Sequence, residues 1–100
     1  MLIVTGHISV PPADLPRFVE EAGHLASVTR QRDGNLSYDI AVLDAAAGRL
    51  LVAERRRDEA ALAAHLRANG TVAFVSRWQG RLLGEVRQYD AENERQIAAT

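Results

Sequence analysis

The stretch NLSYDIAVLDAAAGRLLVAERRR, residues 35–57, decides the fold of this 100-residue chain. Its first part alternates apolar residues with small or polar ones, the two-residue period of a half-buried strand, at Leu36, Tyr38, Ile40 and Val42. A short loop over residues 44–48 ends in a glycine, and residues 49–57 predict a further strand. Two strands joined by about five residues that include a glycine predict an antiparallel hairpin.

The segment before this hairpin predicts a strand and then a helix. Residues 2–10 are apolar and rich in β-branched side chains, and they stop at Pro11-Pro12, which cannot continue a strand ladder. Asp14 predicts a helix N-cap, because its carboxylate can accept from free backbone N–H groups. Apolar residues then recur at helical spacing until Asp33-Gly34, which ends the helix.

The segment after the hairpin predicts a second helical region and a last strand. Asp58 predicts the N-cap of that region. Asn69-Gly70 interrupts it, and Thr71 is expected to cap its second half, which runs to about residue 79. Residues 82–89 predict the fourth strand.

The predicted order is therefore strand, helix, strand, strand, helix, strand. This order is typical of a ferredoxin-like α+β domain, a four-stranded antiparallel sheet with its helices on one face. We expect one such domain over residues 1–89. Residues 90–100 are polar and alanine-rich, and we expect a C-terminal arm that orders only against a partner.

Composition excludes several classes of function. The net charge of −1 lacks the broad positive field of a nucleic-acid binder, so we expect no nucleic-acid partner. All twelve basic residues are arginine, which excludes lysine Schiff-base chemistry, and the absence of cysteine excludes disulfides, thiol nucleophiles and cysteine-based zinc sites. The N-terminus lacks the basic start of a signal peptide, and no apolar run approaches the ~20 residues that span a bilayer. We expect a cytoplasmic protein without a membrane partner.

Apolar residues occupy both faces of the predicted sheet, although the helices can cover only one. One face carries Leu2, Val4, Ile8, Leu50, Val52, Leu82 and Val86, and the other carries Ile3, Leu51, Ala53, Leu83 and Tyr89. An exposed apolar sheet face is an association surface, so the pattern predicts a homodimer packed through the second face. The alternative is that these are single exposed apolar residues, which need no partner.

Motifs for metal or phosphate chemistry are missing from the chain. No G-x-G-x-x-G loop and no G-x-S-x-G serine elbow occurs. Glu20 and His24 lie one helical turn apart, but two ligands without a third usually form a solvated pair, so we expect no metal site. Residues 55–57 are three arginines on a strand; they point to alternate faces, and we expect surface solvation or ion pairs with Glu54 and Glu85.

Five side chains could together line a small apolar pocket with a few polar groups. They are His65, beside the apolar stripe of the second helical region; Phe74 and Trp78, on that stripe; Tyr38, on the second strand; and His7, on the first strand. Each also has an ordinary structural interpretation, because a histidine beside an apolar face and a tryptophan at helical spacing are commonly core residues. Whether these side chains converge is left open by the sequence.

Four short motifs resemble the antibiotic biosynthesis monooxygenase domain. They are Gly34-Asn-Leu-Ser-Tyr38, Leu51-Val-Ala-Glu54, Asp58-Glu-Ala-Ala-Leu-Ala-Ala-His65-Leu66 and Ala73-Phe74. The resemblance covers residues 1 to about 89 and implies a dimeric α/β barrel with a pocket between the sheet and the helices. Some members of this family oxygenate phenols, quinols or polycyclic aromatics without metal or flavin, the substrate itself supplying electrons to O₂.

The resemblance implies a role for each candidate residue and no cofactor. His65 would be the base or the hydrogen-bond partner of a phenolic substrate. Tyr38, Phe74 and Trp78 would be aromatic walls of the pocket, and His7 or Arg87 would stabilise an anionic oxygen. Two alternatives remain at this point: an isomerase or degradative enzyme acting on a small carbonyl compound, and a non-catalytic ligand-binding dimer.

The chain departs from the family pattern at two places. An aromatic residue commonly follows the strand-ending glutamate, but Arg55 and Arg56 follow Glu54 here. Haem-degrading relatives carry a histidine ligand on the second helical region, at a position that register assigns to Val75. Valine cannot ligate iron, so we do not expect haem degradation.

Overall fold

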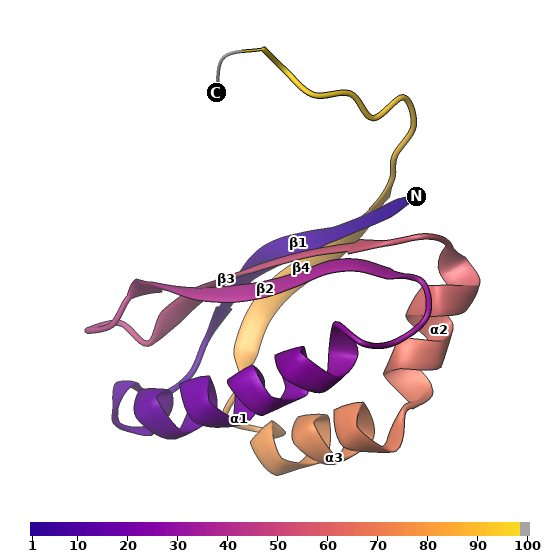
Figure 1. Cartoon of the computed structure of the whole chain (residues 1–100). Coiled ribbons are helices and arrows are strands. Elements are labelled where there is room, and N and C mark those ends of the chain that lie inside the picture. The colour runs from indigo at the N-terminus through magenta and orange to yellow at the C-terminus, as the bar shows by residue number, and fades with distance from the viewer. Residues whose placement is uncertain (99–100) are drawn as a thin grey trace.

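The computed structural model describes residues 1–98, and it confirms the predicted architecture. Its elements are β1 (Leu2–Ser9), the 3₁₀ turn η1 (Pro12–Asp14), α1 (Leu15–Thr29), β2 (Asn35–Asp44), β3 (Arg49–Arg56), α2 (Glu59–Arg67), α3 (Asn69–Trp78) and β4 (Leu83–Asp90). The sheet order is β2-β3-β1-β4, and each neighbouring pair is antiparallel. The helices all pack against one face of this sheet (Figure 1).

Of the three expected helix caps, one is confirmed and two are wrong. The Asp58 carboxylate accepts from the backbone N–H of Ala61 at 2.9 Å, as an N-cap should. Asp14 makes no cap bond, because Pro11-Pro12 start a 3₁₀ turn that leads directly into α1 and leaves Asp14 itself helical. Thr71 lies inside α3, since the chain breaks earlier, at the extended backbone of Ala68.

The main core lies between the sheet and the pair α1 and α3. It consists of Ile8, Val10, Leu15, Phe18, Ala22, Leu25, Leu50, Val52, Phe74 and Trp78. The ring of Phe18 packs edge-on against the Trp78 indole at a centroid distance of 5.0 Å, and it also contacts Phe74. Aromatic pairs in this geometry add stabilisation beyond the area that they bury.

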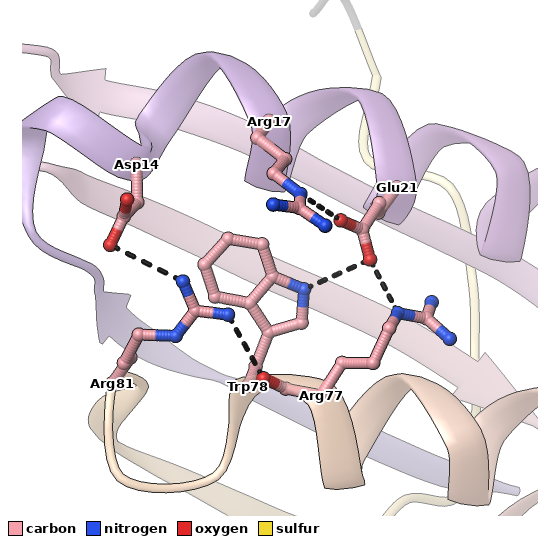
Figure 2. Close-up of polar contacts among 6 residues, drawn as sticks. All are labelled: Asp14, Arg17, Glu21, Arg77, Trp78 and Arg81. Carbon is pink, nitrogen blue, oxygen red and sulfur yellow. Dashed lines mark hydrogen bonds and ion pairs between the residues drawn. The ribbon is translucent and has the colours of Figure 1, made fainter.

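A polar clamp closes this core on the solvent side (Figure 2). Trp78 is 0% exposed, and its Nε1 donates to the Glu21 carboxylate at 3.3 Å. Arg77 donates to the same oxygen at 2.6 Å, and Arg17 donates to the other at 3.0 Å. The Arg81 guanidinium lies 4.3 Å from the indole centroid, in cation–π contact. The clamp therefore ties α3 to α1 around one buried indole.

Among residues 1–98, no helix covers the other face of the sheet (Figure 1), which we call the uncovered sheet face. Its edge strand, β4, is exposed along its whole length, with Leu83 and Tyr89 at 69% and 51% exposure. Gly6 on β1 faces β4 closely, and a Cβ there would collide with the carbonyl oxygen of Glu85. Across residues 1–98, no helix is long and apolar enough to cross a membrane.

The expected C-terminal arm begins one residue later than predicted, because β4 continues to Asp90. Residues 91–98 leave the body of the molecule on the side opposite the helices (Figure 1). The Glu94 carboxylate accepts from Arg55 at 2.7 Å, which links the arm to β3. Residues 99–100 of the expected arm lie outside the described part of the chain.

Candidate functional site

A buried ion pair lies on the helix side of β3. Glu54 and Arg56 follow Leu50 and Val52 at two-residue spacing, so their side chains point toward the helices. Arg56 Nη2 donates to Glu54 Oε1 at 2.7 Å, and the two side chains are 1% and 10% exposed. The helix side of the sheet thus carries two charged groups where a simple core would carry apolar ones.

Tyr38 of β2 lies beside this pair. It is the register partner of Glu54, and its ring centroid is 5.7 Å from the Arg56 guanidinium carbon. Burial raises the pKa of Tyr38 to about 12, and the nearby Glu54 carboxylate acts in the same direction. Burial also raises the pKa of Glu54, against the opposing hydrogen bond from Arg56. Tyr38 is therefore a neutral phenol at physiological pH.

His65 extends from the buried face of α2 onto the Tyr38 ring, with a centroid distance of 5.6 Å. Its Nδ1 lies 2.8 Å from Nη1 of Arg32. A guanidinium can only donate, so Nδ1 must be the acceptor, and the imidazole proton must reside on Nε2. Burial, together with the positive charges of Arg56 and Arg32, lowers the pKa of His65 to about 4. The side chain is therefore a neutral imidazole that presents an N–H donor.

Arg32 lies in the connection between α1 and β2. Its Nη1 also donates to the Thr71 hydroxyl at 2.9 Å, so one guanidinium nitrogen joins α2 to α3. Within the described chain, Arg32 forms no ion pair with a carboxylate, whereas Arg56 pairs with Glu54. Arg32 therefore adds a positive charge to the site that no local acid balances.

A cavity of about 270 Å³ opens onto this group of residues. It is lined by Arg32, Asp33, Arg57, Ala60, Ala61, Ala64 and His65. Asp33 accepts two hydrogen bonds from Arg57, at 3.2 and 3.0 Å, and these hold the pKa of Asp33 below its ordinary value. The alanines leave space along α2, and the cavity lies beside His65 with Arg32 and Arg57 also in its lining.

A second, larger hollow of about 700 Å³ lies on the opposite face of the sheet. It contains His7, Arg49, Arg87 and Tyr89, and His7 Nδ1 lies 3.3 Å from Nη2 of Arg49. Arg87 pairs there with Glu85. This hollow is larger, but it lies on the sheet face that the helices do not cover, whereas the smaller cavity lies beside the buried His65, so we place the candidate site at His65.

The structure separates the predicted site residues into three groups. His65 lines the 270 Å³ cavity, and Tyr38 packs against the His65 ring. Phe74 and Trp78 pack in the core, and Trp78 is fully buried by the clamp. His7 and Arg87 lie across the sheet, in the outer hollow. The six therefore do not share one pocket, and their roles stay predictions.

Several residues of the site were not predicted, although a signal existed for some. Continuing the alternation of Leu50 and Val52 by two positions places Glu54 and Arg56 on the inner face. Arg32 offered no such signal, because it follows a helix end and contacts a residue 33 positions away. Within residues 1–98, no group of three His, Cys, Asp or Glu side chains could hold a metal ion.

A four-stranded antiparallel sheet with its helices on one face, a ferredoxin-like α+β fold, defines the class of this protein. Residues 1–78 match the antibiotic biosynthesis monooxygenase family, and the chain belongs to that family. This membership supports a general monooxygenase-like role. No curated protein is detectably similar in sequence.

Solved structures share the fold over nearly the whole chain. A protein from Deinococcus radiodurans, described as a candidate antibiotic biosynthesis monooxygenase, superposes with a TM-score of 0.88 at 23% identity, covering 99% of this chain and 100% of its own. An antibiotic biosynthesis monooxygenase gives 0.82 at 25% identity, with coverages of 93% and 100%. A Bacteroides thetaiotaomicron protein of unknown function, described as a possible oxidoreductase, gives 0.79 at 16% identity, with coverages of 88% and 94%.

Proposed function

We propose that the protein is a cofactor-independent monooxygenase that oxidises a small phenol or quinol with O₂ in the cavity beside His65. The observation that carries this proposal is the tautomer of His65. Its Nδ1 accepts from Arg32, and no residue among 1–98 bonds to Nε2, so the Nε2–H group remains for a ligand. A donor placed next to an uncompensated guanidinium stabilises a phenolate oxygen as negative charge develops on it.

The proposed reaction uses the substrate as the only electron source. The bound phenol loses its O–H proton to solvent, and the phenolate gives one electron to O₂. The resulting aryloxyl radical and superoxide combine to form a carbon–oxygen bond, and the ring peroxide takes up one proton from solvent to become a hydroperoxide. The O–O bond then breaks with loss of the ring C–H hydrogen, so one oxygen atom stays as a quinone carbonyl and the other leaves as water.

The surroundings of His65 support a role as hydrogen-bond partner of the substrate better than a role as base. As a base it would need a free ring nitrogen, but Nδ1 already accepts from Arg32. Its lowered pKa also makes it a weak proton acceptor. We therefore assign His65 as the hydrogen-bond partner of the substrate oxygen, with Tyr38 as a neutral ring that supports the imidazole from behind.

The cavity volume narrows the proposed substrate class. About 270 Å³ lies just below the ~300–1,000 Å³ typical of small-molecule sites. A one-ring phenol or quinol suits this space better than a polycyclic aromatic. The alanines of α2 offer an apolar wall for the ring, which limits the access of water to a radical intermediate.

The test is oxygen uptake with a panel of one-ring phenols and hydroquinones in the presence of a metal chelator. His65→Phe removes the donor and should lower the rate by ~10²–10³. His65→Gln keeps an amide N–H near the place of Nε2 and should stay within about tenfold of wild type. His24→Gln, at an exposed histidine of α1, is the matched control and should have no effect.

Each result separates the proposal from its alternatives. Equal loss in His65→Phe and His65→Gln would mean that His65 acts as a base. Substrate turnover under strict anaerobiosis would indicate an isomerase or degradative enzyme. Ligand binding without oxygen uptake by the wild type would indicate a ligand-binding protein.

We also propose that two copies pack through the uncovered sheet face. The support is the exposed apolar surface of Leu83 and Tyr89 on β4 and the hollow beside them. Packing sheet against sheet would cover both. Light scattering at micromolar concentration should give a dimer for the wild type and a monomer for Tyr89→Arg, whereas Val28→Arg, at an exposed apolar residue of α1, should stay dimeric. A monomeric wild type would exclude this arrangement.

A further inference from the structure

Arg32 differs from the other arginines of the site in its ionic partners. Arg56 pairs with Glu54 at 2.7 Å, and Arg57 pairs with Asp33 and Asp58 at 3.0 and 3.4 Å. Arg32 has no such partner among residues 1–98 and is half-buried. A half-buried cation without an acid is costly unless another group compensates its charge.

The guanidinium of Arg32 also keeps unused donors. A guanidinium carries five N–H groups, and both contacts of Arg32 come from Nη1, to His65 and to Thr71. The groups on Nη2 and Nε therefore remain for a ligand, as far as the described chain is concerned.

Arg32 lines two cavities. One is the cavity that ends on His65, and the other, of about 220 Å³, lies between α1 and α3. Arg32 and His65 both line the first cavity, so a ligand there lies beside the guanidinium and the imidazole. Two donors of this kind, one of them charged, suit an oxygen that carries negative charge.

We propose that this cavity binds its ligand as an aromatic oxyanion, a carboxylate or phenolate, held between Arg32 and His65, and that Arg32 sets the His65 tautomer. The inference rests on the proposed function for the place of the site, but not on turnover. Arg32 acts in two ways. It neutralises the ligand charge, and by donating to Nδ1 it directs the remaining imidazole proton toward the ligand.

The tautomer is measured directly by long-range ¹H–¹⁵N NMR of the imidazole rings at neutral pH, with the His65 signals assigned by their loss in His65→Gln. The wild type should show a neutral ring protonated at Nε2. Arg32→Met keeps the length of the side chain but removes its charge and donors, so the signals should move toward a tautomer mixture. Arg67→Met removes one positive charge from the exposed end of α2 and should leave the signals unchanged.

Ligand charge is tested by isothermal titration with two pairs of probes of similar shape. Benzoate should bind at least about tenfold more tightly than benzamide, or 2,4-dinitrophenolate more tightly than 1,3-dinitrobenzene by the same factor. The pair that shows the preference identifies carboxylate or phenolate as the preferred source. In Arg32→Met the charged and neutral probes should bind with about equal affinity, whereas in Arg67→Met the preference for the charged probe should persist.

Three results would overturn the inference: an Nδ1–H ring in the wild type, equal binding of charged and neutral probes, or no binding of any probe. Oxygen uptake on the same samples separates the two proposals. Uptake without an anion preference would leave the proposed function standing and remove this inference. An anion preference without oxygen uptake would support this inference and remove the proposed function.

Discussion

Removing the His65 imidazole should change how the stability of the protein depends on pH. The pKa of His65 is lowered from an ordinary value of 6.5 to about 4, first by burial and then by Arg56 and Arg32. Between these pH values the unfolded chain binds a proton that the folded chain does not. The contribution of the neutral His65 to stability is therefore fully present above about pH 6.5 and is lost as the pH falls toward 4.

The magnitude follows from the size of this shift. Each pKa unit corresponds to about 1.4 kcal/mol, so the His65 contribution amounts to about 3 kcal/mol between pH 7 and pH 4. Glu54 acts in the opposite direction, because a raised carboxyl pKa makes the folded state bind its proton first. The Glu54 contribution is present in both the wild type and His65→Gln. The difference between their unfolding free energies therefore reports the contribution of the His65 imidazole alone.

Urea unfolding at pH 7, 6, 5 and 4.5 measures this difference, with the single, buried Trp78 as the fluorescent probe. The wild type should lose stability on acidification more steeply than His65→Gln, by up to about 1.4 kcal/mol per pH unit. Protein concentration must be held constant, because any self-association adds to the apparent stability. Parallel stability curves would refute the reasoning, since they would show that His65 titrates normally in the folded state.

Three further predictions concern the packing around the site, and chemical denaturation checks each. Arg56→Met leaves Glu54 buried without a partner and should lower the free energy of unfolding by about 3–5 kcal/mol. The double variant Glu54→Leu/Arg56→Met should recover most of that loss. Equal losses in the single and double variants would contradict this prediction. Trp78→Ala should cost about 3–5 kcal/mol, and a smaller loss would mean that the indole is not a core group. Glu21→Gln should lower the midpoint of unfolding because it weakens the clamp, whereas Glu20→Gln, at an exposed neighbour, should not; equal midpoints would show that the clamp is not stabilising.

The order of elements could be predicted because its signals are local. The alternation from Leu36 to Val42 and the glycine at position 48 specify a hairpin within one short stretch. The strand bounds came within one or two residues of the structure for the same reason. The caps at Asp14 and Thr71 were wrong, because the turn at Pro11-Pro12 and the break at Ala68 redirect the chain before those side chains can act as caps.

The candidate site was only partly predictable, because it depends on contacts between distant elements. His65 was found from its place beside the apolar stripe of α2, and its partner Tyr38 from the alternation of β2. Trp78 carries the same helical spacing whether it lines a pocket or fills a core, and only the packing of α1 on α3 decides that it is buried. The role of Arg32 could not be predicted, since a loop places it against two helices.

The measurement that tests the central claim most directly is oxygenation of a one-ring phenol under ¹⁸O₂ by the wild type, His65→Gln and His65→Phe side by side. Our account predicts one labelled oxygen atom in the quinone product and the other in water, with turnover retained in His65→Gln and lost in His65→Phe. An unlabelled product, or equal rates in the wild type and His65→Phe, would contradict it.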